Sequence, residues 1–288
     1  MTETVLRYTA FTDPDRADAA AGGNPAGIVL HASGLGDAAM QAIAAEVGYA
    51  ETAFVTDPAV DGDPRHSRLR FFSPVAEVPF CGHATVATAV ALAGRDGTGT
   101  VTFETNVGAI TITTRATDAG TTASFTSIDP RVAPLDPGVL GTLLGLLGVP
   151  ADALHPDYPP RLAYAGNWHP VLVFADRADF DGFTFDPAAM RALMDAQGWP
   201  GTVVTLVPTG AAEFEARNLF PVGTITEDPA TGSAAASVGG YLRELGLVTP
   251  PARVVIRQGR HVGRPSLLLV DVPAAGGIVV SGTAVEIS

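Results

Sequence analysis

An internal repeat is the feature that most constrains the fold of this chain of 288 residues. Short segments of the first half recur in the second half in the same order: 23–25 with 166–170, 37–43 with 187–193, 72–75 with 219–222, 82–84 with 232–234, and 107–108 with 262–263. Ordered self-similarity indicates that one structural unit is built twice. The sequence therefore predicts two pseudo-symmetric halves, residues 1–117 and residues 118–288.

Each half has the pattern strand, helix, strand, strand, helix, strands. The spacing of apolar residues predicts a helix over 37–47 with Asp37 as its cap, and short β-rich runs at 53–55 and 69–72 flank a turn-rich loop. Segments 84–92 and 234–245 are small and apolar on nearly all sides, which is typical of a buried helix. Further strands are predicted at 101–103, 110–113, 253–256 and 267–272. These elements predict an α+β fold in which a mostly antiparallel, curled, barrel-like sheet surrounds one central helix, twice.

The chain contains no lysine, and all of its 17 basic side chains are arginine. Without lysine there is no internal Schiff base, which excludes lysine-dependent pyridoxal phosphate and aldolase chemistry. A Walker A loop is excluded as well, because that loop needs a lysine on the phosphates. The single cysteine excludes an internal disulfide.

The net charge of −13 repels phosphate backbones and anionic lipid, so neither nucleic acid nor a membrane surface is an expected partner. No apolar stretch approaches the ~20 residues needed to span a bilayer. The first residues lack the basic and apolar regions of a signal peptide. We therefore expect a cytoplasmic protein that acts on a small molecule, and an anionic substrate remains compatible with local arginines and helix ends.

Two strands enter buried helices through glycine, at Gly82 and at Gly232. A helix start leaves backbone N–H groups unpaired, and glycine lets an anion approach them closely. If the two halves face each other, both helix starts converge on one cleft that could hold a carboxylate or a developing enolate. The alternative is that both are ordinary helix starts, with Ser233 as a capping residue.

Titratable residues occur in the same segments. Glu51 enters an apolar strand, where burial would raise its pKa and make it a general acid/base near neutral pH. A solvated glutamate at a strand edge is the alternative for Glu51. His83 could donate a hydrogen bond or relay a proton, or could be structural, and Asp228 could anchor the substrate or only start a turn.

Cys81 precedes the first glycine, so its thiolate could act as a base at a helix N-terminus, although a lone cysteine there is also typical of a buried apolar site. Its counterpart in the second half is Thr231, which excludes a symmetric mechanism with two thiols. The six histidines are scattered and no metal-binding motif is present, so no metal site is expected.

The motifs together resemble those of the PhzF-like (phenazine biosynthesis-like) family, which has the diaminopimelate epimerase-like fold. The matching segments follow the family order along nearly the whole chain: 23–26, 51–55, 79–85, 227–235, 258–259 and 263–266. The resemblance implies two similar halves with the active site in the cleft between them, no cofactor, and a homodimer. It does not identify the substrate.

By this resemblance Glu51 would be the catalytic acid/base, with His83 and Asp228 assisting, and Gly82, His83, Gly232 and Ser233 would bind the substrate. The expected activity is a cofactor-independent isomerase that shifts a proton on a small, carboxylate-bearing metabolite derived from an amino acid. Two alternatives stay open. Cys81 could assist an epimerase or racemase, or the chain could be an inactive member of the fold that binds a ligand or a protein.

Overall fold

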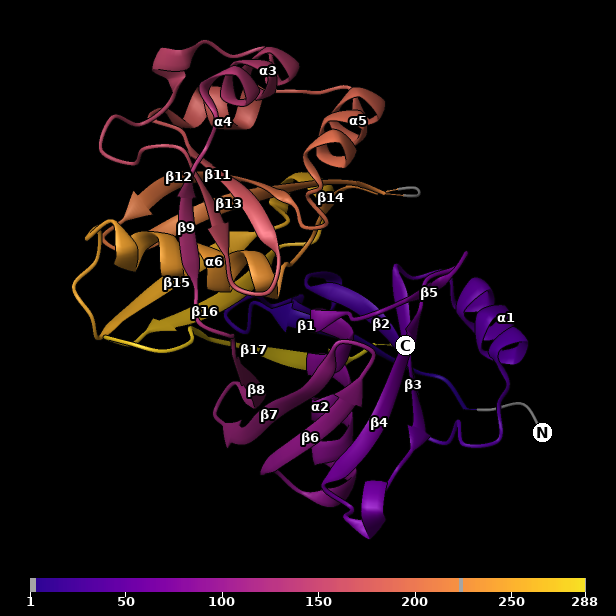
Figure 1. Cartoon of the computed structure of the whole chain (residues 1–288). Coiled ribbons are helices and arrows are strands. Elements are labelled where there is room, and N and C mark those ends of the chain that lie inside the picture. Colours follow the sequence, from indigo (N-terminus) through magenta and orange to yellow (C-terminus); the bar gives the residue numbers. More distant parts are fainter. Residues whose placement is uncertain (1–3, 223–224, 288) are drawn as a thin grey trace. The chain divides into compact units, whose positions relative to one another are not determined.

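The computed structural model describes residues 4–222 and 225–287 in two compact units. The first unit runs to Thr126 and includes the C-terminal segment from Ser281, and the second is Ser127–Val280. Figure 1 gives the elements and their labels. No helix in the described part of the chain combines the length and the apolar character needed to cross a bilayer.

The first unit consists of one curled set of strands and two α-helices. Its elements are β1 (Leu6–Thr12), η1 (Ala19–Ala21), β2 (Asn24–Val29), α1 (Asp37–Val47), β3 (Glu51–Asp57), η2 (Val60–Gly62), β4 (His66–Phe72), β5 (Glu77–Val78), α2 (Gly82–Asp96), β6 (Thr100–Thr105), β7 (Gly108–Thr117) and β8 (Gly120–Thr126), with most of β17 (Val279–Glu286).

The second unit has the same plan with additional helices. Its elements are β9 (Arg131–Pro134), α3 (Pro137–Leu147), η3 (Ala151–Ala153), β10 (Arg161–Tyr164), β11 (Trp168–Val173), α4 (Arg177–Gly182), α5 (Pro187–Gln197), β12 (Val203–Gly210), β13 (Glu213–Val222), β14 (Ile225–Asp228), α6 (Gly232–Glu244), β15 (Ala252–Gln258), η4 (Arg260–Val262) and β16 (Ser266–Val272).

The strand pairings confirm the repeat. In the first unit β2 pairs parallel with β3, β3 antiparallel with β4, β4 parallel with β6, and β6 antiparallel with β7. In the second unit β11, β12, β13, β15 and β16 repeat that order and those directions. The two segments 37–43 and 187–193 lie in α1 and α5, each of which connects a parallel pair of strands. The predicted α+β fold class, with two copies of a mostly antiparallel curled sheet, is therefore confirmed.

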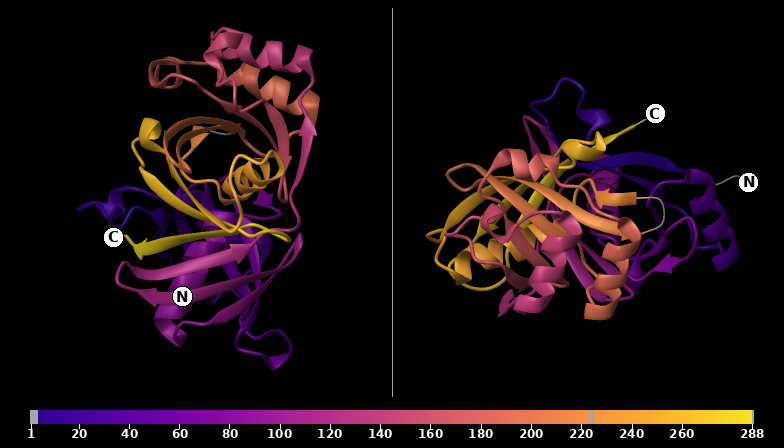
Figure 2. Two further views of the ribbon diagram at one scale, coloured as in Figure 1. Left: turned by 90° about the vertical axis from the view of Figure 1, so that its left-hand side faces the viewer. Right: turned by 90° about the horizontal axis from the view of Figure 1, so that it is seen from above.

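One helix lies at the centre of each unit. All residues of α2 from His83 to Ala93 are buried, and the helix contacts strands β1, β2, β3, β7 and β8. In the second unit α6 contacts β9, β10, β11 and β16, and Figure 2 shows strands curving around it. Small side chains allow this close packing: a Cβ atom on Gly240 would lie 2.4 Å from the ring of Pro130. Burial on all sides explains why both segments are apolar around the whole helix.

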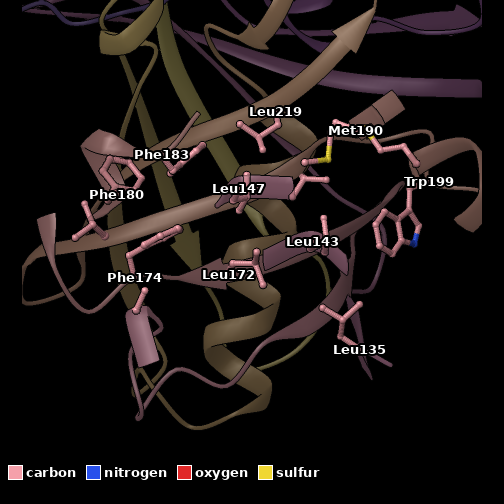
Figure 3. Packing of buried hydrophobic residues seen from close by; sticks show 14 residues of the cluster. Leu135, Leu143, Leu147, Leu172, Phe174, Phe180, Phe183, Met190, Trp199 and Leu219 are labelled. Carbon is pink, nitrogen blue, oxygen red and sulfur yellow. The ribbon is translucent and has the colours of Figure 1, made fainter. Parts of the chain in front are cut away.

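A separate hydrophobic cluster in the second unit joins α3, α4 and α5 to strands β11–β13 (Figure 3). Its buried members include Leu143, Phe174, Phe180, Met190 and Trp199. Helix α3 was not predicted from the sequence, although its start and stop signals are present. Asp136 accepts hydrogen bonds from the N–H groups of Gly138 and Val139, proline is the first helical residue, and Gly148 ends the helix in a left-handed conformation.

Two local expectations need correction. Asp37 is not the cap of α1, because Gly36 occupies the N-cap position; the Asp37 carboxylate instead bonds the Arg70 guanidinium at 2.7 Å. The boundary of the compact units lies after Thr126, whereas the sequence analysis placed it after Thr117. Thr117 pairs with Gly120 at the turn that joins β7 and β8, so the predicted boundary falls inside a hairpin.

Candidate active site

Three side chains of the first unit meet at the start of α2. Glu51 is the first residue of β3, and Cys81 and His83 stand at the N-cap and the second helical position of α2. The Sγ atom of Cys81 lies 3.4 Å from Oε2 of Glu51 and 3.3 Å from Nδ1 of His83. Nε2 of His83 lies 3.5 Å from the same Glu51 oxygen. The fold thus brings a carboxyl group, a thiol and an imidazole into mutual contact.

His83 is a neutral ring near pH 7. Burial lowers its pKa to about 4, and a hydrogen bond to the backbone of Pro25 opposes this shift. Since proline has no N–H, the Pro25 carbonyl accepts and the imidazole donates. The contact between His83 and Glu51 therefore involves an uncharged ring. The Glu51 side chain keeps 19% of its surface exposed, so solvent and small molecules can reach the carboxyl group.

The start of α2 has room beside it. A Cβ atom built on Gly82 would have only the Phe80 ring within 4 Å, at 3.9 Å. The side chain of the N-cap residue, Cys81, makes no capping hydrogen bond to the helix. Figure 1 shows α2 among the strands of its unit. A ligand oxygen could therefore approach the first N–H groups of α2, where the helix dipole favours negative charge.

The second unit places Asp228, Gly232 and Ser233 around the start of α6. Asp228 ends β14, and its carboxylate accepts a 2.5 Å hydrogen bond from the hydroxyl of Thr231. Gly232 is the first residue of α6, as Gly82 is of α2, so both helix starts lie where the sequence predicted them. The N-cap residue is Thr231, which corrects the alternative assignment of Ser233 as the cap.

The buried amide of Gln258 holds this second helix start in place. Its Nε2 donates to the carbonyl of Asp228 at 2.6 Å and to the Thr231 hydroxyl at 3.1 Å. Its Oε1 accepts from the N–H of Thr231 at 3.3 Å and from Asn218 at 3.1 Å. Gln258 lies in the sequence motif 258–259, which by itself does not predict this role. The sequence signal that could have indicated this role of Gln258 is a polar side chain directly before a glycine at a strand end.

His169 was missed entirely. It is fully buried in β11, and its Nε2 lies 3.3 Å from the hydroxyl of Ser233. On the other side of the ring, Nδ1 lies 3.0 Å from both the N–H nitrogen and the carbonyl oxygen of Thr202. A Cβ atom on Gly201 would lie 2.5 Å from the ring, so only glycine fits there. The position of His169 in the repeat, after Gly166, was the signal that could have indicated it.

Burial lowers the pKa of His169 to about 4, which leads to a testable pH dependence. Between about pH 6.5 and pH 4 the unfolded chain binds a proton at this ring and the folded chain does not, so acid favours unfolding. Over the full range this group lowers the free energy of unfolding by roughly 3 kcal/mol. Urea unfolding from pH 7 to pH 4 measures it. As the pH falls over this range, we expect the free energy of unfolding to decrease less for His169→Asn than for wild type. The control His31→Asn, at an exposed position, should show the wild-type decrease. Equal slopes for all three proteins would contradict the assignment.

Two groups of side chains among the described residues bring three metal-ligating atoms within 4.8 Å of one another. One is Glu51, Cys81 and His83, and the other is Asp181, Glu215 and His261. In the second group Arg177 bonds Glu215 at 2.6 Å, and Arg260 bonds both carboxylates. Arginines thus already occupy the oxygens of the second group. A surface hollow of about 550 Å³ beside the end of α3 contains none of the residues predicted for the site.

Each unit therefore assembles one part of the predicted site. The first brings together Glu51, Gly82 and His83, and adds Cys81. The second brings together Asp228, Gly232 and Ser233, supported by Gln258 and His169. That both parts act on one substrate in a shared cleft stays a prediction.

Comparisons with known proteins show which enzymes this chain is similar to. An isomerase of Mesorhizobium japonicum whose activity is uncharacterised is 32% identical over 295 residues, covering 97% of this chain and 94% of the relative. Trans-2,3-dihydro-3-hydroxyanthranilate isomerase of Pseudomonas aeruginosa is 28% identical over 270 residues, covering 92% of this chain and 90% of the relative. Fold and relatives together define the chain as an enzyme of the isomerase class.

The family follows from the match along the chain. The family model described as phenazine biosynthesis-like protein (PhzC-PhzF) matches residues 8–288, and the chain belongs to this family. A solved structure described as a predicted epimerase from Pseudomonas aeruginosa is 26% identical, with a TM-score of 0.82; the match covers 100% of this chain and 98% of that chain. A hydroxyproline epimerase from Agrobacterium vitis shares the fold at 14% identity, with a TM-score of 0.60 over 99% of this chain and 91% of its own.

Proposed function

We propose that this protein is a cofactor-independent isomerase that shifts a proton on a small, carboxylate-bearing metabolite derived from an amino acid, with Glu51 as the general acid/base. One observation carries the proposal. Glu51 Oε2, the neutral ring of His83 and the room beside Gly82 occur together at the start of a buried helix. A carboxyl group next to an anion-binding helix start is suited to removing a proton α to a carboxylate.

The residues divide the chemistry as follows. Glu51 takes a proton from substrate carbon and returns it at another carbon or on the other face. The N–H groups at the start of α2 stabilise the negative charge that develops as the proton leaves, in the manner of an oxyanion hole. His83 donates a hydrogen bond and stays uncharged, so it does not form an ion pair with Glu51. Asp228, Gly232 and Ser233 bind the other end of the substrate.

The names of relatives support the substrate class. The Pseudomonas aeruginosa relative is named as an isomerase of trans-2,3-dihydro-3-hydroxyanthranilate, and the Agrobacterium vitis epimerase was solved with trans-4-hydroxy-L-proline bound. Both compounds are cyclic amino acids with a carboxylate. We therefore place the substrate of this protein among small cyclic or α-amino acids. A homodimer and a cytoplasmic location are parts of the same proposal.

Cys81 favours a second candidate function. Its sulfur lies within 3.4 Å of both Glu51 Oε2 and His83 Nδ1, which is close enough to exchange a proton with either group. A thiol at a helix N-terminus is readily ionised. Cys81 could then serve as one base of an epimerase or racemase. Because Cys81 and Glu51 are in contact and cannot flank one carbon, Asp228 is the candidate for the second base on the opposite face.

One experiment separates the two candidates. Wild type and Cys81→Ala are incubated in deuterated water with a panel of cyclic dienyl acids, prolines and α-amino acids, and deuterium on carbon and product stereochemistry are recorded. The isomerase proposal expects deuterium incorporation, a shifted double bond or proton, and little change in Cys81→Ala. Inversion at a single carbon that is lost in Cys81→Ala would establish the epimerase. No incorporation with any acid would overturn both.

A further inference from the structure

The three side chains at the start of α2 have the chemistry of a zinc site. Cys81 offers a thiolate, His83 an imidazole nitrogen and Glu51 a carboxylate oxygen, and their ligand atoms lie within 4.8 Å of one another. These are the three kinds of protein ligand that Zn²⁺ prefers. The scattered histidines gave no sign of this group in the sequence, since Glu51 joins it only through the fold.

The distances between the ligand atoms match a tetrahedral ion. Zn²⁺ binds sulfur at ~2.3 Å and nitrogen or oxygen at ~2.0–2.1 Å, so its tetrahedral ligands lie about 3.3–3.6 Å from one another. With Nε2 of His83 as the ligand nitrogen, the sulfur lies 3.4 Å from Glu51 Oε2 and 3.7 Å from Nε2, the second distance being slightly longer than the tetrahedral spacing. Nε2 of His83 lies 3.5 Å from the carboxylate oxygen. An ion therefore fits among the three groups with little movement.

The surroundings also suit a metal ligand set. The Pro25 carbonyl accepts a hydrogen bond from the His83 ring, and hydrogen bonds to a backbone carbonyl commonly orient ligating histidines. Cys81 and His83 are each only 7% exposed. Glu51 is the most exposed of the three, so the open fourth position of the ion would lie toward solvent.

From this geometry we infer that Glu51, Cys81 and His83 form an inhibitory site for Zn²⁺ or a similar thiophilic ion. On binding, the thiol releases its proton to solvent and three protein atoms take three positions of the ion, with water in the fourth. The ion occupies the oxygen with which Glu51 would take a proton, so it blocks catalysis. The binding itself does not depend on the proposed function, whereas the inhibition rests on the proposed role of Glu51.

Cobalt provides a direct test of binding, because Co²⁺ replaces Zn²⁺ and reports its ligands by absorption. The metal-free protein is titrated with Co²⁺ and then with Zn²⁺. We expect a thiolate-to-cobalt charge-transfer band, visible bands of a four-coordinate ion, and loss of both on addition of one equivalent of Zn²⁺. Mg²⁺, which prefers oxygen ligands, should have no effect.

Variants identify the ligands. Loss of an outer hydrogen-bond partner of a ligand typically weakens metal binding by ~10–100-fold, so loss of a ligand should weaken it at least about 100-fold. We expect Cys81→Ser to abolish the charge-transfer band and Glu51→Gln to keep the band at weaker affinity. His261→Gln is the matched control, because its cluster has similar groups already bonded to arginine. It should bind as wild type does.

The cobalt titration of wild type and of the variants can overturn the proposed metal site. A missing charge-transfer band in wild type, or one that persists in Cys81→Ser, would overturn the site. Circular dichroism checks that Cys81→Ser is folded, and Glu51→Gln supplies the second variant if it is not. If Zn²⁺ binds as described and the protein exchanges no proton with any acid, the metal site stands and only the proposed function fails.

Discussion

Replacing Glu51 by glutamine is expected to lower the rate of solvent deuterium incorporation into substrate carbon by ~10²–10⁴-fold, the usual contribution of a positioned general base. Glutamine has the same shape as glutamate but cannot take up the proton at neutral pH. Because the side chain stands at the edge of the site with 19% of its surface exposed, the fold should tolerate the change. Mass spectrometry of the substrate after incubation in deuterated water measures the rate.

The control is Glu46→Gln, which removes one negative charge from an exposed position on α1 of the same unit. It should exchange deuterium at the wild-type rate and unfold at the wild-type temperature. If Glu51→Gln also keeps the wild-type rate, Glu51 is not the base. An equal decrease of the exchange rate in both variants would indicate a general effect of removing a negative charge.

Combining Glu51→Gln with Asp228→Asn tests whether the two parts of the site act on one substrate. When two residues stabilise one transition state, the effects of replacing them are strongly non-additive. The exchange rate of the double variant should therefore fall much less than the product of the two single rate decreases. Independent sites would give multiplied losses. The same comparison therefore tests the predicted cleft without reference to the position of one unit relative to the other.

Replacing Arg217 by methionine is expected to destabilise the protein by about 3–5 kcal/mol, since it leaves a buried carboxylate without its partner. Arg217 and Glu227 are 7% and 8% exposed, and their charged groups lie 2.6 Å apart. The guanidinium also donates to the carbonyl oxygens of Phe180 and Phe183 and stacks 3.6 Å from the Phe183 ring centre. Urea unfolding at pH 7 measures the loss.

Two further variants give this prediction its control. Arg253→Met removes an arginine from an exposed pair with Asp271 and should cost no more than ~1 kcal/mol. Adding Glu227→Leu to Arg217→Met removes the stranded carboxylate and should restore part of the lost stability. A loss in Arg217→Met no larger than that in Arg253→Met would show that the buried pair does not stabilise the unit. Because Glu227 directly precedes Asp228, the pair also supports the candidate site.

Much of the candidate site was predictable, because its residues lie in short segments with strong local signals. Gly82 and Gly232 mark the change from strand to buried helix, and both helices begin there. The contact of Glu51 with Cys81 and His83 was not predictable in the same way. It depends on the parallel register that pairs Glu51 with Ala26, and on the position of α2 beside β2 and β3. His169 gave too weak a local signal, since a buried histidine in a strand resembles any other core residue until its partners are known.

The sequence by itself determined the repeat, the apolar centres of both units and the residue types that carry the chemistry, because these depend on local periodicity and composition. Only the tertiary structure decided which segments meet. β1 takes β17 as its antiparallel neighbour from the opposite end of the chain, whereas the corresponding strand β10 takes the nearby β9. The alternation of apolar and polar residues in a strand predicts which face of the strand is buried. It does not predict which other strand pairs with it, since the backbone hydrogen bonds are the same for every partner strand. For the same reason, the Glu51 carboxyl group meets the thiol of Cys81 and the imidazole of His83, two neighbours in the sequence, only in the fold.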